Sequence, residues 1–187
     1  TEKAKQNLIN EGKNPNTIFV TGNTVIDALK TTVKKDYNHP ELEWAKNSRL
    51  IFITAHRREN LGQPMHNMFR AIRRVMEENP DLKALYPIHM NPIVRRAADE
   101  ELGNFDRIHI IDPIEVLDCH NIMARSYLIL TDSGGIQEEA PSLGKPVLVM
   151  REKTERPEGI AAGTLKLVGT DEKTIYENFK ELLTDNK

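Results

Sequence analysis

The sequence has a single cysteine, Cys119, among its 187 residues. An internal disulfide is therefore excluded, and one thiol cannot form a thiolate metal site. No pair among the six histidines has the spacing of a zinc site. We accordingly expect no metal and no cofactor, and the scarcity of cysteine fits a reducing cytoplasm.

Long apolar runs are also lacking, and none reaches the length that a membrane-spanning helix needs. The formal net charge is only −2, which gives no overall reason to expect nucleic acid or a membrane surface as a partner. Hydrophobic residues at 39% and charged residues at 29% are typical of a soluble globular domain. The helical period already present from Ala4 to Ile9, after a first residue Thr1, leads us to expect a fragment that starts upstream.

Short apolar runs rich in β-branched residues alternate with segments of helical period. The runs predict strands at residues 18–21, 50–54, 83–87, 107–111, 127–131 and 146–150, with a weaker edge strand at 164–168. Apolar residues three and four positions apart predict helices over residues 65–76, 93–102 and 175–183, and residues 34–48 form the least regular connection. Strands that alternate with single helices imply an α/β fold, a Rossmann-like parallel sheet with helices on both faces.

A glycine pair follows the strand predicted at residues 127–131. In Ser133-Gly134-Gly135 the two glycines let the backbone turn tightly into a helix, whose free N–H groups and dipole suit a phosphate. Glu139 lies four residues past Gly135 on the same helix face, where it could accept hydrogen bonds from a ribose. The pattern alone favours a nucleotide only slightly over a plain strand–turn–helix corner with acidic residues that complement the dipole.

Side chains that attract anions follow several of the predicted strands. They are His56, Arg57, Arg58, His89, Arg151 and Arg156. Ligands of a parallel α/β sheet bind outside the carboxyl ends of the strands, so this clustering predicts a phosphorylated ligand. At least one of Arg57 and Arg58 is expected to be only a solvated charge, and His89 could instead shape a turn.

Other histidines and carboxylates give weaker indications. His109 lies inside an apolar run and is expected to be a core histidine, whereas His66 and His120 have no partners in the sequence that indicate a site. Asp112 and Asp132 end predicted strands and are expected to cap the segments after those strands, with no pattern that supports an acid–base pair.

Ordered blocks along nearly the whole chain resemble the C-terminal half of the non-hydrolysing UDP-N-acetylglucosamine 2-epimerases. The blocks are Val20–Leu29, Ala55–Asn60, Tyr86–Pro92, Leu128–Gly135, Gln137–Leu148, Glu155–Glu158 and Leu167–Thr170. The resemblance implies a GT-B-type enzyme with its active site between two Rossmann-like domains. Residues 1–187 would be the C-terminal UDP-binding domain, with the N-terminal domain absent, a chain that continues past Lys187 and a homodimeric full-length enzyme.

The resemblance also implies the reaction and the residues that serve it. The reaction is inversion at C2 of UDP-N-acetylglucosamine to give UDP-N-acetylmannosamine, by elimination and re-addition of UDP, within cell-surface polysaccharide biosynthesis. By position, the diphosphate loop would be Ser133, Gly134 and Gly135, and the ribose contact Glu139. Arg156 and His56 would lie near the diphosphate and the reacting centre, which makes His56 the catalytic candidate.

Three further expectations come from the same resemblance. Arg57 and His89 match positions that contact a second, activating nucleotide sugar in bacterial members, and Cys119 stands where many relatives place an aromatic residue against the uracil. The carboxylates for proton transfer come from the N-terminal domain, so the fragment alone is expected to be inactive. The alternative is the nucleotide-sugar-binding domain of a GT-B glycosyltransferase, against which the His-Arg-Arg-Glu-Asn loop argues.

Overall fold

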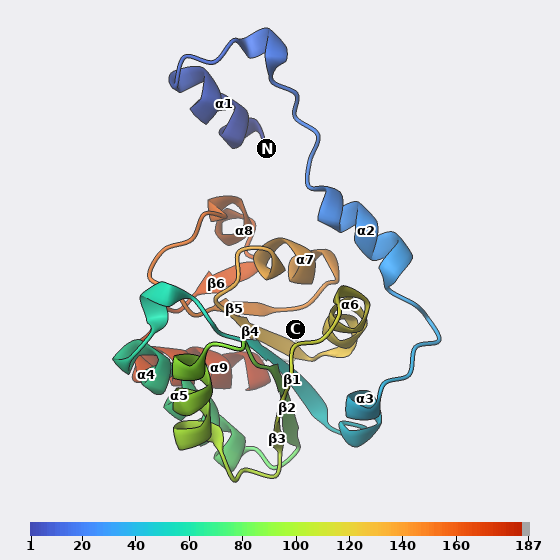
Figure 1. Ribbon diagram of the computed structural model, residues 1–187, viewed down its shortest axis with the longest axis vertical. Coiled ribbons are helices and arrows are strands. Elements are labelled where there is room, and N and C mark those ends of the chain that lie inside the picture. The colour runs from blue at the N-terminus through green and yellow to red at the C-terminus, as the bar shows by residue number, and fades with distance from the viewer. Residues whose placement is uncertain (185–187) are drawn as a thin grey trace.

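The computed structural model describes residues 1–184, which contain a single six-stranded sheet (Figure 1). Its strands are β1 (Arg49–Thr54), β2 (Leu82–Pro87), β3 (Ile108–Ile111), β4 (Leu128–Thr131), β5 (Val147–Val149) and β6 (Leu165–Leu167). The order is β3-β2-β1-β4-β5-β6 and every neighbouring pair is parallel. The predicted Rossmann-like sheet is confirmed, and its order reverses between β1 and β4, which is where ligands bind in such sheets.

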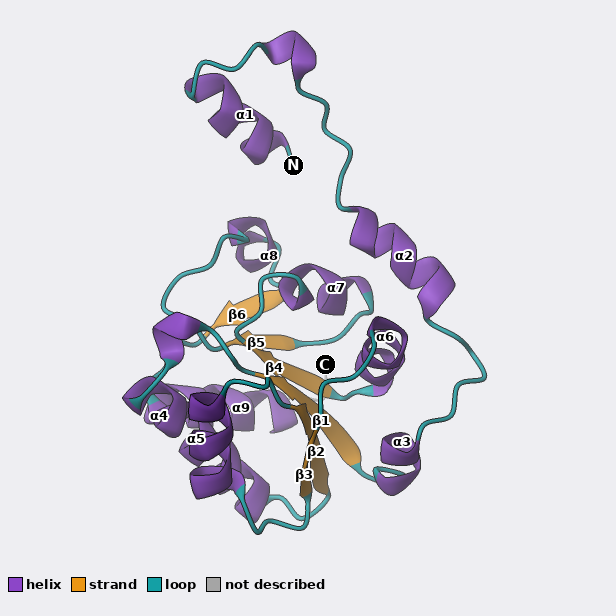
Figure 2. Cartoon of the chain, in the orientation of Figure 1, coloured by secondary structure: helices purple, strands orange, loops and turns teal. Residues whose placement is uncertain are grey.

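The described part of the chain also contains nine helices and two short 3-10 turns. They are α1 (Glu2–Asn10), η1 (Pro15–Thr17), α2 (Thr24–Thr32), α3 (Pro40–Trp44), η2 (Arg58–Asn60), α4 (Gln63–Glu78), α5 (Pro92–Leu102), α6 (Val116–Arg125), α7 (Ile136–Ser142), α8 (Pro157–Ala161) and α9 (Glu172–Thr184). Helices cover both faces of the sheet, whereas α1 lies apart from it (Figure 2). The predicted helices 65–76, 93–102 and 175–183 correspond to α4, α5 and α9.

Side-chain alternation along β1 divides the core into two layers. Ile51 and Ile53 point into the layer that α4, α5 and α9 cover, whereas Leu50 and Phe52 point into the layer that α6 and α7 cover. Successive side chains of a strand face opposite sides, so a strand covered on both faces reads as a continuous apolar run. Full burial of such a side chain contributes about 1.5–3 kcal/mol to the stability of the fold. Strands covered on both faces therefore favour apolar residues at successive positions, which is why the central strands could be recognised in the sequence.

The predicted strand at residues 18–21 is wrong. Residues 18–23 have no regular secondary structure, and the side chain of Phe19 is 81% exposed. Figure 1 shows this segment with α1 and η1 away from the sheet, so no strand of the described residues lies beside it to accept its backbone hydrogen bonds. β-Branched composition alone does not make a strand, because the ladder needs a partner.

His109 is not the core histidine that the apolar run predicted. It lies on the edge strand β3, where its ring stacks on Trp44 with 3.5 Å between ring centroids. Its Nδ1 is 2.7 Å from a carboxylate oxygen of Glu41, and its side chain is 36% exposed. β3 is an edge strand, and the short helix α3 covers this histidine only in part.

The carboxylate of Asp132 connects the loops that follow β1 and β4. It accepts hydrogen bonds from the backbone N–H groups of His56 (2.9 Å) and Arg57 (2.8 Å) and from Nδ2 of Asn60 (3.1 Å). Asp132 is fully buried. Burial raises the pKa of this carboxyl group, while the N–H donors and His56 oppose that rise. The sequence predicted that Asp132 caps the segment after its own strand, β4. The structure shows that its carboxylate instead caps the loop after the neighbouring strand, β1.

Substitution of Asp132 with alanine should destabilise the fold by about 1–3 kcal/mol at neutral pH, because one buried and two partly buried N–H donors lose their acceptor. The free energy of unfolding from urea titration measures this loss. Asp112→Ala is the matched control, since Asp112 also follows a strand but its side chain is 81% exposed. Equal losses for both variants would show that Asp132 does not organise the loops.

Candidate functional site

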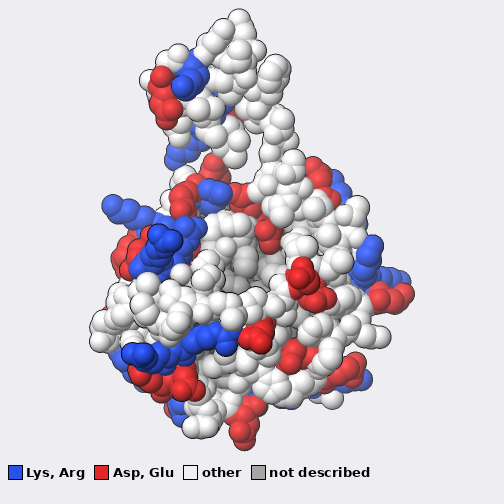
Figure 3. Space-filling model, in the orientation of Figure 1, with Lys and Arg blue, Asp and Glu red and all other residues white. Residues whose placement is uncertain are grey.

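A pocket of about 200 Å³ opens at the carboxyl ends of β1, β2 and β4. Its lining combines strand-end residues with side chains from α6 and α7: Phe52, Thr54, His56, Pro87, Ile88, His89, Pro113, Ile114, Cys119, Ser133 and Ile136. Figure 3 shows a largely uncharged hollow on this side of the molecule with charged side chains around it. The pocket lies at the reversal of strand order and contains three of the predicted site residues, His56, His89 and Ser133.

In the glycine loop, Ser133-Gly134-Gly135, neighbouring side chains approach the backbone closely, and the backbone angles are ordinary. Neither Gly134 nor Gly135 has a positive φ, contrary to a turn that only glycine could form. A Cβ at Gly134 would lie 3.1 Å from Nη2 of Arg57, and one at Gly135 would lie 3.3 Å from Oε1 of Glu139. The glycines therefore let the side chains of Arg57 and Glu139 lie directly against the backbone that precedes α7.

Unpaired backbone donors collect at the same loop. The N–H of Ser133 donates to Oγ1 of Thr131 at 2.9 Å. Those of Gly134, Gly135 and Ile136 make no backbone hydrogen bond within the described residues. Such donors at the start of a helix suit an anion.

The structure brings together candidates that the sequence had assigned to different ligands. The rings of His56 and His89 stack with 5.2 Å between centroids, although they follow different strands. Nε of Arg57 donates to the backbone carbonyl of Asp132 at 3.2 Å, which places its guanidinium over the glycine loop. These three side chains and Ser133 therefore form one continuous surface.

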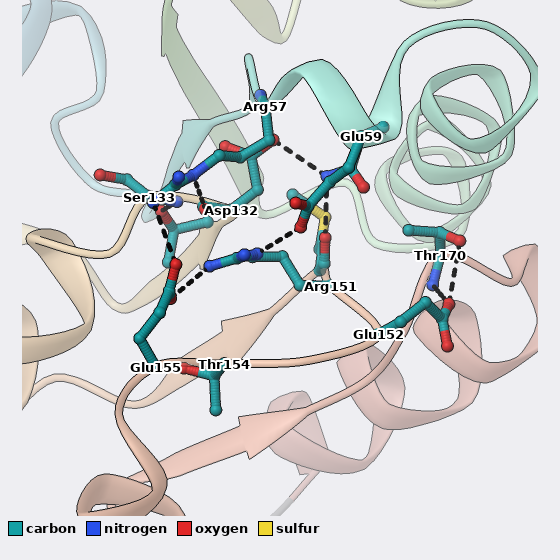
Figure 4. Close-up of polar contacts among 12 residues, drawn as sticks. Arg57, Glu59, Asp132, Ser133, Arg151, Glu152, Thr154, Glu155 and Thr170 are labelled. Atoms are coloured by element: carbon teal, nitrogen blue, oxygen red, sulfur yellow. Dashed lines mark hydrogen bonds and ion pairs between the residues drawn. The ribbon is translucent and has the colours of Figure 1, made fainter. Parts of the chain in front are cut away.

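Two predicted rim cations, Arg151 and Arg156, are already paired with carboxylates, and Figure 4 shows the pairs of Arg151. Arg151 is buried, and its guanidinium donates to Glu59 at 2.7 Å and to Glu155 at 2.6 Å. The hydrogen bond from Arg151 lowers the pKa of Glu155, so that carboxylate stays ionised. Arg156 donates to Glu138 on α7. Arg151 therefore holds the loop after β5 in place, and its predicted role toward an anion stays a prediction.

Arg58 shows the outcome expected for one of the two neighbouring arginines. It is exposed and makes no ion pair within residues 1–184. Arg57, in contrast, is half-buried and has Nη2 3.8 Å from Oε1 of Glu155. Arg57 is therefore the member of the pair that lies against the glycine loop.

Glu139 has a partner that the sequence did not indicate. Its Oε2 lies 3.6 Å from Nε2 of His120, a buried residue of α6. Burial raises the pKa of Glu139, and the neighbouring His120 opposes that rise. The expectation that His120 has no site partners is wrong, and the contact was invisible to periodicity because it joins two different helices.

Cys119 lines the pocket next to His120. Burial, with a smaller contribution from Glu139 and Asp118, raises the pKa of its thiol to about 12. The thiol therefore stays neutral at physiological pH and offers the pocket a small apolar surface.

Two kinds of feature are not found in the described part of the chain. Within residues 1–184, no group of three or more His, Cys, Asp and Glu side chains could hold a metal ion. Among the helices of the same residues, none has the length and apolar character needed to cross a membrane.

Comparison with known proteins places the chain in a family. A family model described as UDP-N-acetylglucosamine 2-epimerase matches residues 1–187. The chain is 60% identical over 185 residues to the UDP-N-acetylglucosamine 2-epimerase of Bacillus subtilis, and the match covers 99% of this chain and 49% of that protein.

Solved structures give the same result. The S. aureus MnaA–UDP co-structure is similar with a TM-score of 0.95 and 52% identity, covering 99% of this chain and 51% of that one. The UDP-GlcNAc 2-epimerase from Neisseria meningitidis bound to UDP-GlcNAc has a TM-score of 0.90 and 44% identity, covering 98% and 52%. The chain thus spans about half the length of the relatives it matches. It belongs to the UDP-N-acetylglucosamine 2-epimerase family.

Proposed function

We propose that residues 1–187 are the UDP-binding half of a two-domain, GT-B-type enzyme that interconverts UDP-N-acetylglucosamine and UDP-N-acetylmannosamine by inversion at C2. The observation that carries the proposal is the glycine loop at the strand-order reversal, with unpaired N–H groups beside Glu139. The UDP and UDP-GlcNAc complexes of the two similar structures support the ligand class.

In this proposal the N–H groups at the start of α7 bind the diphosphate, and Glu139 accepts hydrogen bonds from the ribose hydroxyls. Arg156 would contact the diphosphate after exchanging its partner Glu138 for the ligand. Cys119 would pack against the uracil in place of an aromatic ring.

His56 is the proposed catalytic residue of this half. It lies exposed at the pocket beside Ser133, where a donor can stabilise the charge of UDP as the bond to the sugar breaks. The base that takes the C2 proton would come from the N-terminal half of the enzyme. Arg57 and His89 would contact a second, activating nucleotide sugar, although their packing against Gly134 and His56 also fits bracing of the same loops. We further propose a cytoplasmic homodimer that serves cell-surface polysaccharide synthesis.

The ribose contact is testable in the chain itself. Glu139→Ala should weaken UDP binding about tenfold or more, because hydrogen bonds to a charged group contribute about 1.5–3 kcal/mol. Pyrophosphate, which lacks the ribose, should bind almost as before in calorimetry. Glu177→Ala on α9 is the control and should change neither ligand. Equal losses of UDP and pyrophosphate affinity in the Glu139 variant would remove its ribose role.

The role of His56 requires an enzyme that contains both halves. There His56→Ala should lower kcat/KM about a hundredfold or more, the scale of losing one positioned catalytic group. The thermal unfolding temperature should change little, since the side chain is exposed. Arg58→Ala, in the same loop and also exposed, should retain activity. An unfolded His56 variant would instead indicate a purely structural residue.

The proposal that the base for the C2 proton comes from the N-terminal half gives a third test. Residues 1–187 alone should leave the C2 proton of UDP-N-acetylglucosamine unexchanged in heavy water, because a C2–H bond does not ionise without a positioned base. The two-domain enzyme should introduce deuterium at C2 of both epimers, as followed by NMR. Exchange by the chain alone would place a base within it.

A further inference from the structure

His120 is a buried residue whose side chain lies where three helices, α2, α6 and α7, meet beside the proposed nucleotide site. It belongs to α6 and is only 2% exposed. Its Nδ1 lies 2.8 Å from Oγ1 of Thr32 at the end of α2, and its Nε2 lies 3.6 Å from Oε2 of Glu139 on α7. Nδ1 is thus within hydrogen-bond distance of Thr32, whereas Nε2 faces the carboxylate of Glu139 across a longer electrostatic contact.

The two partners determine the proton arrangement of the ring. Glu139 offers a carboxylate, which cannot donate, so we assign a proton to Nε2. The hydroxyl of Thr32 lies 2.8 Å from Nδ1 and 3.0 Å from the backbone carbonyl of Ala28. Whether it donates to Nδ1, or accepts from Nδ1 while it donates to Ala28, it holds Nδ1 and so fixes which nitrogen faces the carboxylate. The ring therefore presents an N–H group to Glu139.

The end of α2 is fixed by the same turn of α6. Asn121, next to His120, donates from Nδ2 to the backbone carbonyl of Thr32 at 2.8 Å and accepts from the N–H of Lys34 at 2.8 Å. The amide nitrogen and the amide oxygen of Asn121 thus both bind the backbone at the C-terminal end of α2. Thr32 stays within reach of the imidazole only while α2 is packed in this position.

The two oxygens of Glu139 have different surroundings. Oε1 lies against Gly135, at the loop proposed to bind the diphosphate, whereas Oε2 faces His120. Burial and the neighbouring Glu138 both disfavour the charged form of Glu139, and His120 is the group that favours it. Without His120 the carboxylate would lose the interaction that keeps it ionised and turned toward the loop.

We propose that His120 is a positioning residue, which holds the Glu139 carboxylate ready to accept the ribose hydroxyls and couples this readiness to the packing of α2 through Thr32. The inference deepens the proposed UDP site and depends on it. His120 itself does not contact the ligand. Its effect should therefore fall on the nucleoside part of the ligand and pass through Glu139.

The test compares UDP and pyrophosphate binding to the chain by calorimetry. His120→Leu, which fills the site without a donor, should weaken UDP about tenfold and pyrophosphate less than twofold. His120→Gln, whose amide N–H can replace Nε2, should recover most of the UDP affinity. In a Glu139→Ala background, His120→Leu should have no further effect on UDP, because the group through which it acts is gone.

Substitutions at Thr32 test the coupling to α2 and do not require a change at a fully buried residue. Thr32→Val should weaken UDP about threefold, whereas Thr32→Ser, which keeps the hydroxyl, should bind as the parent chain does. If His120→Leu or Thr32→Val weakens both ligands equally, or if His120→Gln is no better than His120→Leu, the positioning role is wrong. A parent chain that binds UDP no more tightly than pyrophosphate would instead contradict the proposed function itself.

Discussion

The buried carboxylate of Asp132 is the constraint on which the rest of the site depends. It lies at the end of β4 and binds the backbone of His56 and Arg57 after β1, which joins the two strands where the sheet order reverses. Asn60 extends the connection, since its Nδ2 also donates to the backbone carbonyl of Met150 after β5 at 3.1 Å. Three loops from three strands are thus held by one carboxylate and one amide. The positions of His56 at the pocket and of Arg57 over the glycine loop follow from that arrangement.

Charge on this rim is largely compensated within the protein. Arg151 and Arg156 are paired with carboxylates of the same loops, so they stabilise the rim while contributing little free positive charge. The donors at the pocket and the glycine loop are the backbone N–H groups before α7 and the side chains of Arg57, His56 and His89, of which Arg57 also faces Glu155 at 3.8 Å. The backbone donors are preorganised by the fold, which is the property expected of a site that stabilises a leaving group.

Much of the fold could be predicted because its signals are local. Apolar residues spaced three and four positions apart identified α4, α5 and α9, and continuous apolar runs identified all six strands to within about one residue at each end. The run at residues 18–21 has the same composition but no neighbouring strand in the described chain, so composition misled there. The continuation expected past Lys187 lies outside the described residues.

The site was predictable only in part, for a physical reason. The glycine loop and the residues after each strand are identified by their place in the chain, and the structure brings His56, His89 and Ser133 to one pocket. Their ligand roles stay predictions. Contacts between different elements leave no periodic pattern in the sequence, so neither the pairing of His120 on α6 with Glu139 on α7 nor the pairing of Arg151 with Glu59 could be predicted. The sequence predicted a tight glycine turn at positions 134 and 135, but neither glycine has a positive φ, and what their small size provides is space for the side chains of Arg57 and Glu139 beside the backbone.

The most direct test of this account is an NMR titration of the isotopically labelled chain with UDP, following each backbone amide. The account predicts that the largest shifts occur in residues 133–139 and 55–57, the two loops that Asp132 joins, with smaller shifts at Cys119 and His120. Shifts concentrated at the amino ends of the strands, around Arg49, Arg125 and Lys145, would contradict this prediction. The absence of saturable shifts at the glycine loop would contradict it as well.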